Sequence, residues 1–161
     1  MNIFDTVLPQ LSVEIQSSNG KLPLTIKGPV VPKNIIIDGS SGSQFLTGLL
    51  MAYSSFDLHE SVVIKVNSLK SKPYIDLTLS VIESFGLNLP LNDGYDNFTF
   101  MPARKNNSTQ DVEYEIESDW SGASFLLVAA AIAGKIKLKG ISKGSKQADK
   151  AILDEIGRAH V

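Results

Sequence analysis

The sequence has no cysteine, a single tryptophan and only two histidines among its 161 residues. A chain without cysteine forms no disulfide, carries no thiolate nucleophile and holds no cysteine-ligated metal. The histidines, His59 and His160, lie far apart, and no third ligand is patterned around either of them. The sequence therefore predicts no metal site.

Long hydrophobic runs and an excess of one charge are also lacking. The longest apolar stretch, residues 125–133, is well short of the roughly 20 residues that span a bilayer. The first 20 residues lack the basic start and apolar run of a signal peptide. Fifteen basic against seventeen acidic residues give a net charge of -2, which does not indicate a polyanion-binding surface. We expect a cytoplasmic protein that binds neither membrane nor nucleic acid, although a small anion needs only local donors.

Apolar residues make up 43% of the chain and charged residues 20%, which is enough for an ordinary buried core. Several segments alternate in polarity or are rich in β-branched residues, as strands are. The predicted strands are Val13–Gln16, Leu24–Lys27, Ile35–Asp38, Val62–Val66, Phe98–Met101, Val112–Glu117 and Lys135–Lys139.

Four helices are predicted between these strands. Residues 43–56 carry a broad apolar face, so this helix should be buried on most sides. The second begins at Pro73 and ends at Gly86, residues that suit the first turn and the C-terminal cap. The third runs from about Ser121 to Ala133, and the fourth starts near Lys146.

The pattern of strands and helices repeats within the chain. The segment from Ile36 to Leu46 matches the segment from Tyr114 to Leu126, which places Gly42 and Gly122 at equivalent positions 80 residues apart. The polar residues 102–110 form the best boundary between the two copies. Two related units of alternating strands and helices predict an α/β architecture.

Three helix starts carry polar residues that suit an anion. Residues 38–44 form a glycine-bearing turn before a helix, residues 71–74 combine Ser, Lys and Tyr, and residues 119–122 combine Asp, Ser and the only Trp. Free backbone N–H groups at a helix start attract phosphates and carboxylates. The same residue types also serve as ordinary N-caps, and capping explains Asp119 well.

Two of these segments resemble signatures of the 5-enolpyruvylshikimate-3-phosphate synthase family. They are Ser43-Gln44-Phe45-Leu46-Thr47-Gly48-Leu49-Leu50-Met51 and Ser71-Lys72-Pro73-Tyr74-Ile75-Asp76-Leu77-Thr78-Leu79. The third segment, Ser121-Gly122-Ala123-Ser124-Phe125 before an Ala-rich helix, follows in the family's order. The resemblance covers about residues 22 to 154.

The resemblance implies which residues bind shikimate-3-phosphate. Ser43 and Gln44 match the family's Ser-Ser-Gln, with Gln44 also reaching phosphoenolpyruvate, and Ser71 and Tyr74 match its Ser-Lys-Pro-Tyr. Gly42 stands where the family has the leading serine, so only its backbone N–H would face the phosphate. Residues 145–149 resemble the family's Ser-x-Gln-Gly-Asp, with alanine in place of the glycine, and we assign that segment no ligand.

The family's fold is an inside-out α/β barrel of six βαβαββ units, of the α/β (α+β) class, and this chain would hold about two of them. We expect residues 1–101 to form the first unit with extra N-terminal strands and residues 111–154 to form a second, truncated unit. Residues 155–161 break the family pattern and are expected to be a non-native tail. The alternative is a divergent helix end, capped at Gly157.

By resemblance, the parent enzyme transfers the enolpyruvyl group of phosphoenolpyruvate to the 5-hydroxyl of shikimate-3-phosphate and releases phosphate. No cofactor or metal is implied, and we expect a monomeric enzyme. None of the matched residues is a catalytic acid or base, so we expect this internal fragment to be inactive alone. The alternatives are a UDP-N-acetylglucosamine enolpyruvyl transferase and a non-catalytic anion-binding module of the same fold.

Overall fold

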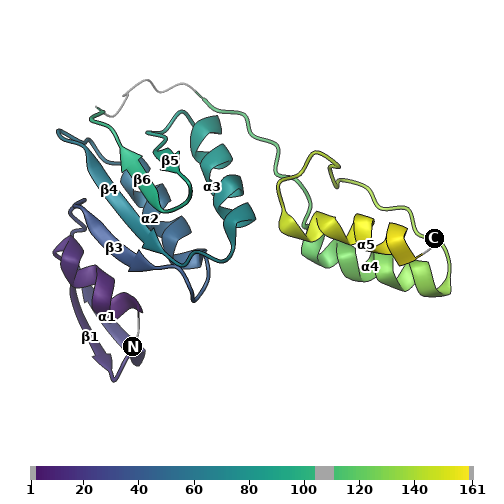
Figure 1. Cartoon of the computed structure of the whole chain (residues 1–161), viewed down its shortest axis with the longest axis horizontal. Helices are drawn as coiled ribbons and strands as arrows, with labels where there is room; N and C mark the ends of the chain where they lie inside the picture. The colour runs from purple at the N-terminus through teal and green to yellow at the C-terminus, as the bar shows by residue number, and fades with distance from the viewer. Residues whose placement is uncertain (1–2, 104–110, 160–161) are drawn as a thin grey trace. The chain divides into compact units, whose positions relative to one another are not determined.

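The computed structural model describes residues 3–103 and 111–159. Two compact units, Met1–Gln110 and Asp111–Val161, make up the chain. The first unit contains α1 (Ile3–Val7), the 3-10 helix η1 (Leu8–Leu11), β1 (Glu14–Ser18), β2 (Lys21–Lys27), β3 (Ile35–Asp38), α2 (Gln44–Ser54), β4 (Val62–Asn67), α3 (Lys72–Ser84), β5 (Leu91–Asp93) and β6 (Asn97–Phe100) (Figure 1). The second contains α4 (Trp120–Ala133), the 3-10 helix η2 (Ala148–Ala151) and α5 (Ile152–Ala159).

The first unit is built on a four-stranded sheet in the order β3-β4-β6-β5. Strands β3 and β4 are parallel and are joined through α2, whereas β6 pairs antiparallel with both β4 and β5. From β3 to β6 the element order is therefore βαβαββ. This arrangement confirms the predicted mixed α/β class.

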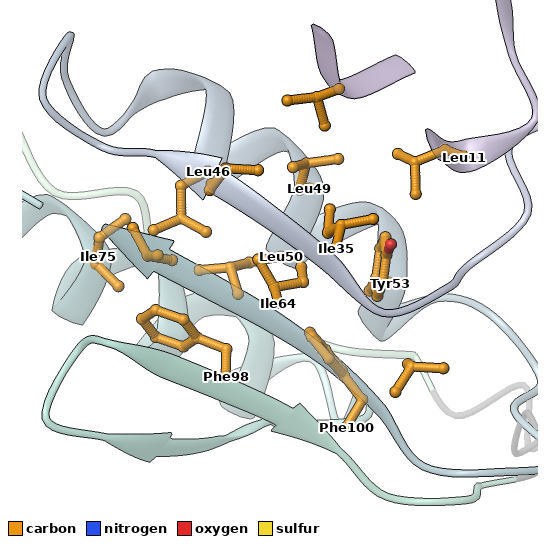
Figure 2. Close-up of a cluster of buried hydrophobic side chains, with 14 of the residues drawn as sticks. Leu11, Ile35, Leu46, Leu49, Leu50, Tyr53, Ile64, Ile75, Phe98 and Phe100 are labelled. Carbon is orange, nitrogen blue, oxygen red and sulfur yellow. The ribbon is translucent and has the colours of Figure 1, made fainter. Parts of the chain in front are cut away.

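One face of this sheet forms the core. Alternate strand residues, such as Ile35, Ile64 and Phe98, are almost fully buried and belong to one cluster with residues of α2 and α3 (Figure 2). The opposite face is more open, with Ile36 55% exposed. The unit is thus a two-layer structure in which α2 and α3 cover the same face of the sheet.

Helices α2 and α3 lie where the sequence predicts them, but α2 is less buried than expected. Its core face is formed by Leu46, Leu50 and Tyr53, whereas Met51 is 49% exposed. Helix α3 has proline in its first turn and is followed by Gly86 in a left-handed conformation (φ +63°). Proline at the start and glycine after the end therefore determine where α3 begins and ends.

Three short elements of the first unit were not predicted. Strand β5 is three residues long and all of its residues are exposed, so it carries no apolar pattern. Helices α1 and η1 precede the first predicted strand and bury Val7 and Leu11 in the core. Strands β1 and β2 match predicted strands and form a separate antiparallel hairpin.

In the second unit, α4 lies where the third helix is predicted and ends before Gly134. The fourth helix starts later than predicted, because residues 148–151 form a 3-10 turn and α5 begins at Ile152. Trp120, at the start of α4, is 1% exposed, and its indole N–H donates to the Ser142 carbonyl at 3.1 Å.

The two strands predicted in the second unit are wrong, because residues 112–117 and 135–139 have no regular secondary structure. A strand needs backbone hydrogen bonds to a partner. The bond between these two parts of the chain, from the Ser118 N–H to the Gly140 carbonyl, lies just after each predicted strand. Ile116 is 85% exposed, so the apolar alternation here has no core to face. The alternating sequence is present, but no packed layer among the described residues covers its apolar side to stabilise a strand.

No helix within residues 3–103 and 111–159 is long and apolar enough to cross a membrane. Within the same ranges, no group of three or more histidine, aspartate or glutamate side chains could hold a metal ion.

Candidate functional site

The turn after β3 brings the chain close to the turn after β4. The Gly39 N–H donates to the Asn67 carbonyl at 2.8 Å, and a Cβ at Gly39 would lie 2.9 Å from the Leu69 Cα, so only glycine fits there. The Ser40 backbone N–H donates to Asp38 at 2.9 Å. This bond and the Ser40 side chain lower the pKa of Asp38, with a smaller contribution from Lys70 in the other turn.

Helix α2 follows the first turn directly. Ser43 is its N-cap residue but makes no side-chain capping bond, and it is 5% exposed. Gln44 is exposed, so its amide is the more accessible donor of the two. The Gly42 N–H donates to the Gly39 carbonyl at 3.3 Å, so in this structure it serves the turn rather than facing outward as predicted.

Helix α3 begins at the same edge of the sheet, because its start follows the carboxyl end of β4 and β4 is parallel to β3. Its N-cap residue, Ser71, also makes no side-chain capping bond. Tyr74 lies in the first turn of α3 and is 39% exposed. Carboxyl ends of adjacent parallel strands are the usual place for a ligand in open α/β sheets.

A tyrosine from the β5–β6 hairpin contacts the first turns of α3. The Tyr95 hydroxyl donates to Asp76 at 2.7 Å, and the Lys72 ammonium lies 4.9 Å from the centre of the Tyr95 ring. The hydrogen bond to Asp76 is the main cause that raises the pKa of Tyr95 above its ordinary value of 10.0. This cluster was not predicted, since nothing in the sequence pairs Tyr95 with Asp76.

The third helix start differs from the other two. Asp119 caps α4, accepting the backbone N–H groups of Ser121 at 3.1 Å and Gly122 at 2.9 Å. Its carboxylate therefore already occupies the place that an external anion would take. This confirms the capping interpretation of Asp119 and sets α4 apart from α2 and α3.

Residues 145–149, to which we assigned no ligand, support the start of α4. The Gln147 side chain accepts the Trp120 N–H at 2.8 Å and donates to Glu117 at 3.0 Å. Ser145, which is buried, donates its hydroxyl to the same Glu117 oxygen at 2.8 Å, and Asp149 accepts the Ser121 hydroxyl at 2.7 Å. These contacts are internal, so the segment fixes the start of α4.

A cavity of about 490 Å³ lies beside the start of α2. Ser41 and Gln44 supply its polar side chains, and the other side chains that line it are Ile3, Phe4, Phe45 and Leu49. Such a lining suits an apolar group rather than a phosphate.

Comparisons with known proteins agree with the motifs. The family model described as EPSP synthase (3-phosphoshikimate 1-carboxyvinyltransferase) matches residues 2–160. A relative from Buchnera aphidicola subsp. Cinara cedri is 44% identical over 79% of this chain and 29% of its own length. One from Haemophilus ducreyi is 39% identical over 91% of this chain and 33% of its own length.

A further relative, from Pasteurella multocida, is 37% identical over 96% of this chain and 35% of its own length. All three relatives bear the name 3-phosphoshikimate 1-carboxyvinyltransferase. The chain thus spans about a third of the length of the curated relatives it matches. With the family model matching nearly the whole chain, the resemblance predicted from the motifs at Ser43 and Ser71 is confirmed, and the chain belongs to the EPSP synthase family.

Proposed function

We propose that this chain supplies part of the shikimate-3-phosphate site of an enzyme that transfers the enolpyruvyl group of phosphoenolpyruvate to the 5-hydroxyl of that substrate, releasing phosphate. The names of the relatives supply the reaction. One observation carries the proposal. Helices α2 and α3 start at the same sheet edge without side-chain caps, whereas the Asp119 carboxylate accepts the first N–H groups of α4. An external anion has donors at the first two starts.

The residues act by holding charge in place. Backbone N–H groups at both helix starts, with the hydroxyls of Ser43, Ser71 and Tyr74, donate to the phosphate and ring of shikimate-3-phosphate. Gln44 reaches the same ligand and phosphoenolpyruvate. Fixed donors of this kind lower the barrier by bringing two anions together without reorganisation. We assign no general acid or base to this chain.

Residues 1–101 are proposed to form one βαβαββ unit with extra N-terminal strands and residues 111–154 part of a second, within a six-unit inside-out barrel. The βαβαββ order from β3 to β6 supports the first unit. The whole enzyme is proposed to be a cytoplasmic monomer.

Titrating the isotope-labelled chain with shikimate-3-phosphate, while following backbone amide shifts, tests the site. A neutral hydrogen bond contributes only about 0.5–1.5 kcal/mol, so a few of them give roughly millimolar affinity. Shifts should gather at residues 42–44 and 71–74, and Ser71→Ala and Tyr74→Phe should each weaken binding. Ser124→Ala is the matched control, because it removes a serine hydroxyl near the start of α4, outside the proposed site.

Shikimate without its phosphate is the ligand control and should leave these amides unmoved. Shifts that gather at residues 121–124 instead would refute the placement of the anion site. Equal responses to shikimate and to shikimate-3-phosphate would do the same, since they would show that the phosphate is not what the helix starts bind.

A further inference from the structure

A pair of threonine hydroxyls joins the two helices that carry the proposed site. Thr47 Oγ1 of α2 lies 3.1 Å from Thr78 Oγ1 of α3. Thr78 is 7% exposed, and its hydroxyl donates to the Tyr74 carbonyl at 2.8 Å. A hydroxyl has a single proton to donate, so the bond between the two threonines must be donated by Thr47.

Each threonine lies one helical turn after a proposed ligand residue. The Thr47 N–H donates to the Ser43 carbonyl at 2.8 Å, and the Thr78 hydroxyl donates to the Tyr74 carbonyl. Three hydrogen bonds therefore link Ser43, the two threonines and Tyr74, the first through the backbone of Thr47 and the second through its side chain. They connect the first turn of α2 with the first turn of α3.

Thr47 differs from the serines of these two helices. Ser54, Ser80 and Ser84 each donate to a carbonyl of their own helix, whereas Thr47 bonds across to the neighbouring one. Around the pair, the helix faces in the core are apolar, with Leu46 and Ile75 at most 1% exposed. Apolar contacts tolerate sliding, but a hydrogen bond between two part-buried hydroxyls is made at one register only.

We infer that Thr47 and Thr78 are positioning residues, which fix the axial register of α2 against α3 and so set the spacing of the donors on the two helix starts. The inference rests on the proposed function for the identity of the ligand, shikimate-3-phosphate. Neither threonine needs to touch that ligand, because both act through the turns that carry Ser43 and Tyr74.

The test compares hydroxyl-deleting and hydroxyl-retaining variants of the full chain. Thr47→Val and Thr78→Val should each weaken shikimate-3-phosphate binding about 2- to 10-fold, the factor that corresponds to one neutral hydrogen bond. The double variant should be no weaker than the worse single one, because both changes break the same link. Thr78→Ser should restore the affinity, and Ser80→Ala, which removes a hydroxyl bonded within α3, should leave it unchanged.

A second readout needs no ligand. In the free chain, Thr78→Val should shift the backbone amides of Ser43 and Gln44 on the other helix, whereas Ser80→Ala should not. If the unsubstituted chain fails to bind shikimate-3-phosphate, the proposed function fails, and the amide shifts still decide the inference. Valine variants that bind as tightly as the unsubstituted chain, or α2 amides that do not move, would overturn it.

Discussion

Gly42 offers a sharp prediction, because the family motif has serine where this chain has glycine. Its φ is +123°, in a region that L side chains rarely adopt, and a Cβ there would lie 2.6 Å from the Gln44 Oε1. The Gln44 side chain is flexible and can turn away, so the cost of Gly42→Ser lies mainly in the backbone. Residues held in such conformations are strained by about 1–3 kcal/mol.

The expected loss is measurable in the first unit. For a domain of this size, each kcal/mol lowers the melting temperature by about 4–8 °C, so Gly42→Ser should melt at least about 4 °C below the unsubstituted chain. Gly42→Ala should fall by a similar amount, since it has the same backbone strain and no hydroxyl. Circular dichroism during heating measures both, and the Gln44 side-chain amide should shift in each.

Gly48 supplies the control. It lies inside α2, and a Cβ there would meet nothing within 4 Å. Gly48→Ala should therefore stabilise the chain by about 0.5–1 kcal/mol, opposite in sign to the change at Gly42. If Gly42→Ser melts at or above the unsubstituted chain while Gly48→Ala behaves as expected, the backbone argument is wrong.

Two further predictions concern capping and pH. Asp119→Ala should cost about 0.5–2 kcal/mol and speed amide exchange at Ser121 and Gly122, whereas Asp119→Asn should retain most of the cap; unchanged exchange in the alanine variant would contradict this. Asp76→Asn should lower the pKa of Tyr95 towards its ordinary value of 10.0 in an alkaline absorbance titration, and an unmoved titration would contradict the assigned cause. Because the folded pKa of Tyr95 is raised, its bond to Asp76 should stabilise the fold below pH 10 and lose this effect as the pH rises through the folded pKa.

Helix boundaries could be predicted from the sequence where residues of restricted conformation mark them. Proline in the first turn of α3, Gly86 after it and Gly134 after α4 act locally, so no knowledge of the neighbours is needed. Helix α5 lacks such a mark at its start, and its onset at Ile152 was missed.

Strands in the second unit could not be predicted in the same way. The alternation in residues 112–117 is as regular as that in β4, but a strand is stabilised by pairing and by a covering layer that lie elsewhere in the chain. β4 has β3 and β6 as neighbours, whereas Ile116 is 85% exposed. Apolar alternation in a sequence shows that a segment can pair as a strand, but it does not show that a neighbouring strand is present.

The motifs at Ser43 and Ser71 could be predicted, because each is a continuous run of residues. The contacts that support them could not, since they join distant positions: Thr47 with Thr78, and Tyr95 with Asp76. The difference between the open starts of α2 and α3 and the filled start of α4 also depends on side-chain direction. Ser and Asp both favour N-caps, and only the structure shows which of them bonds the backbone.

The burial of Trp120 gives the chain a built-in optical label. It is the only tryptophan, it lies in the second unit at 1% exposure, and three of the four tyrosines lie in the first unit. Emission excited where tyrosine does not absorb therefore follows residues 111–161 alone, whereas far-ultraviolet ellipticity follows the helices of both units. Melting curves that coincide for the two signals would mean that both units unfold in one cooperative step, and curves that separate would give each unit its own stability.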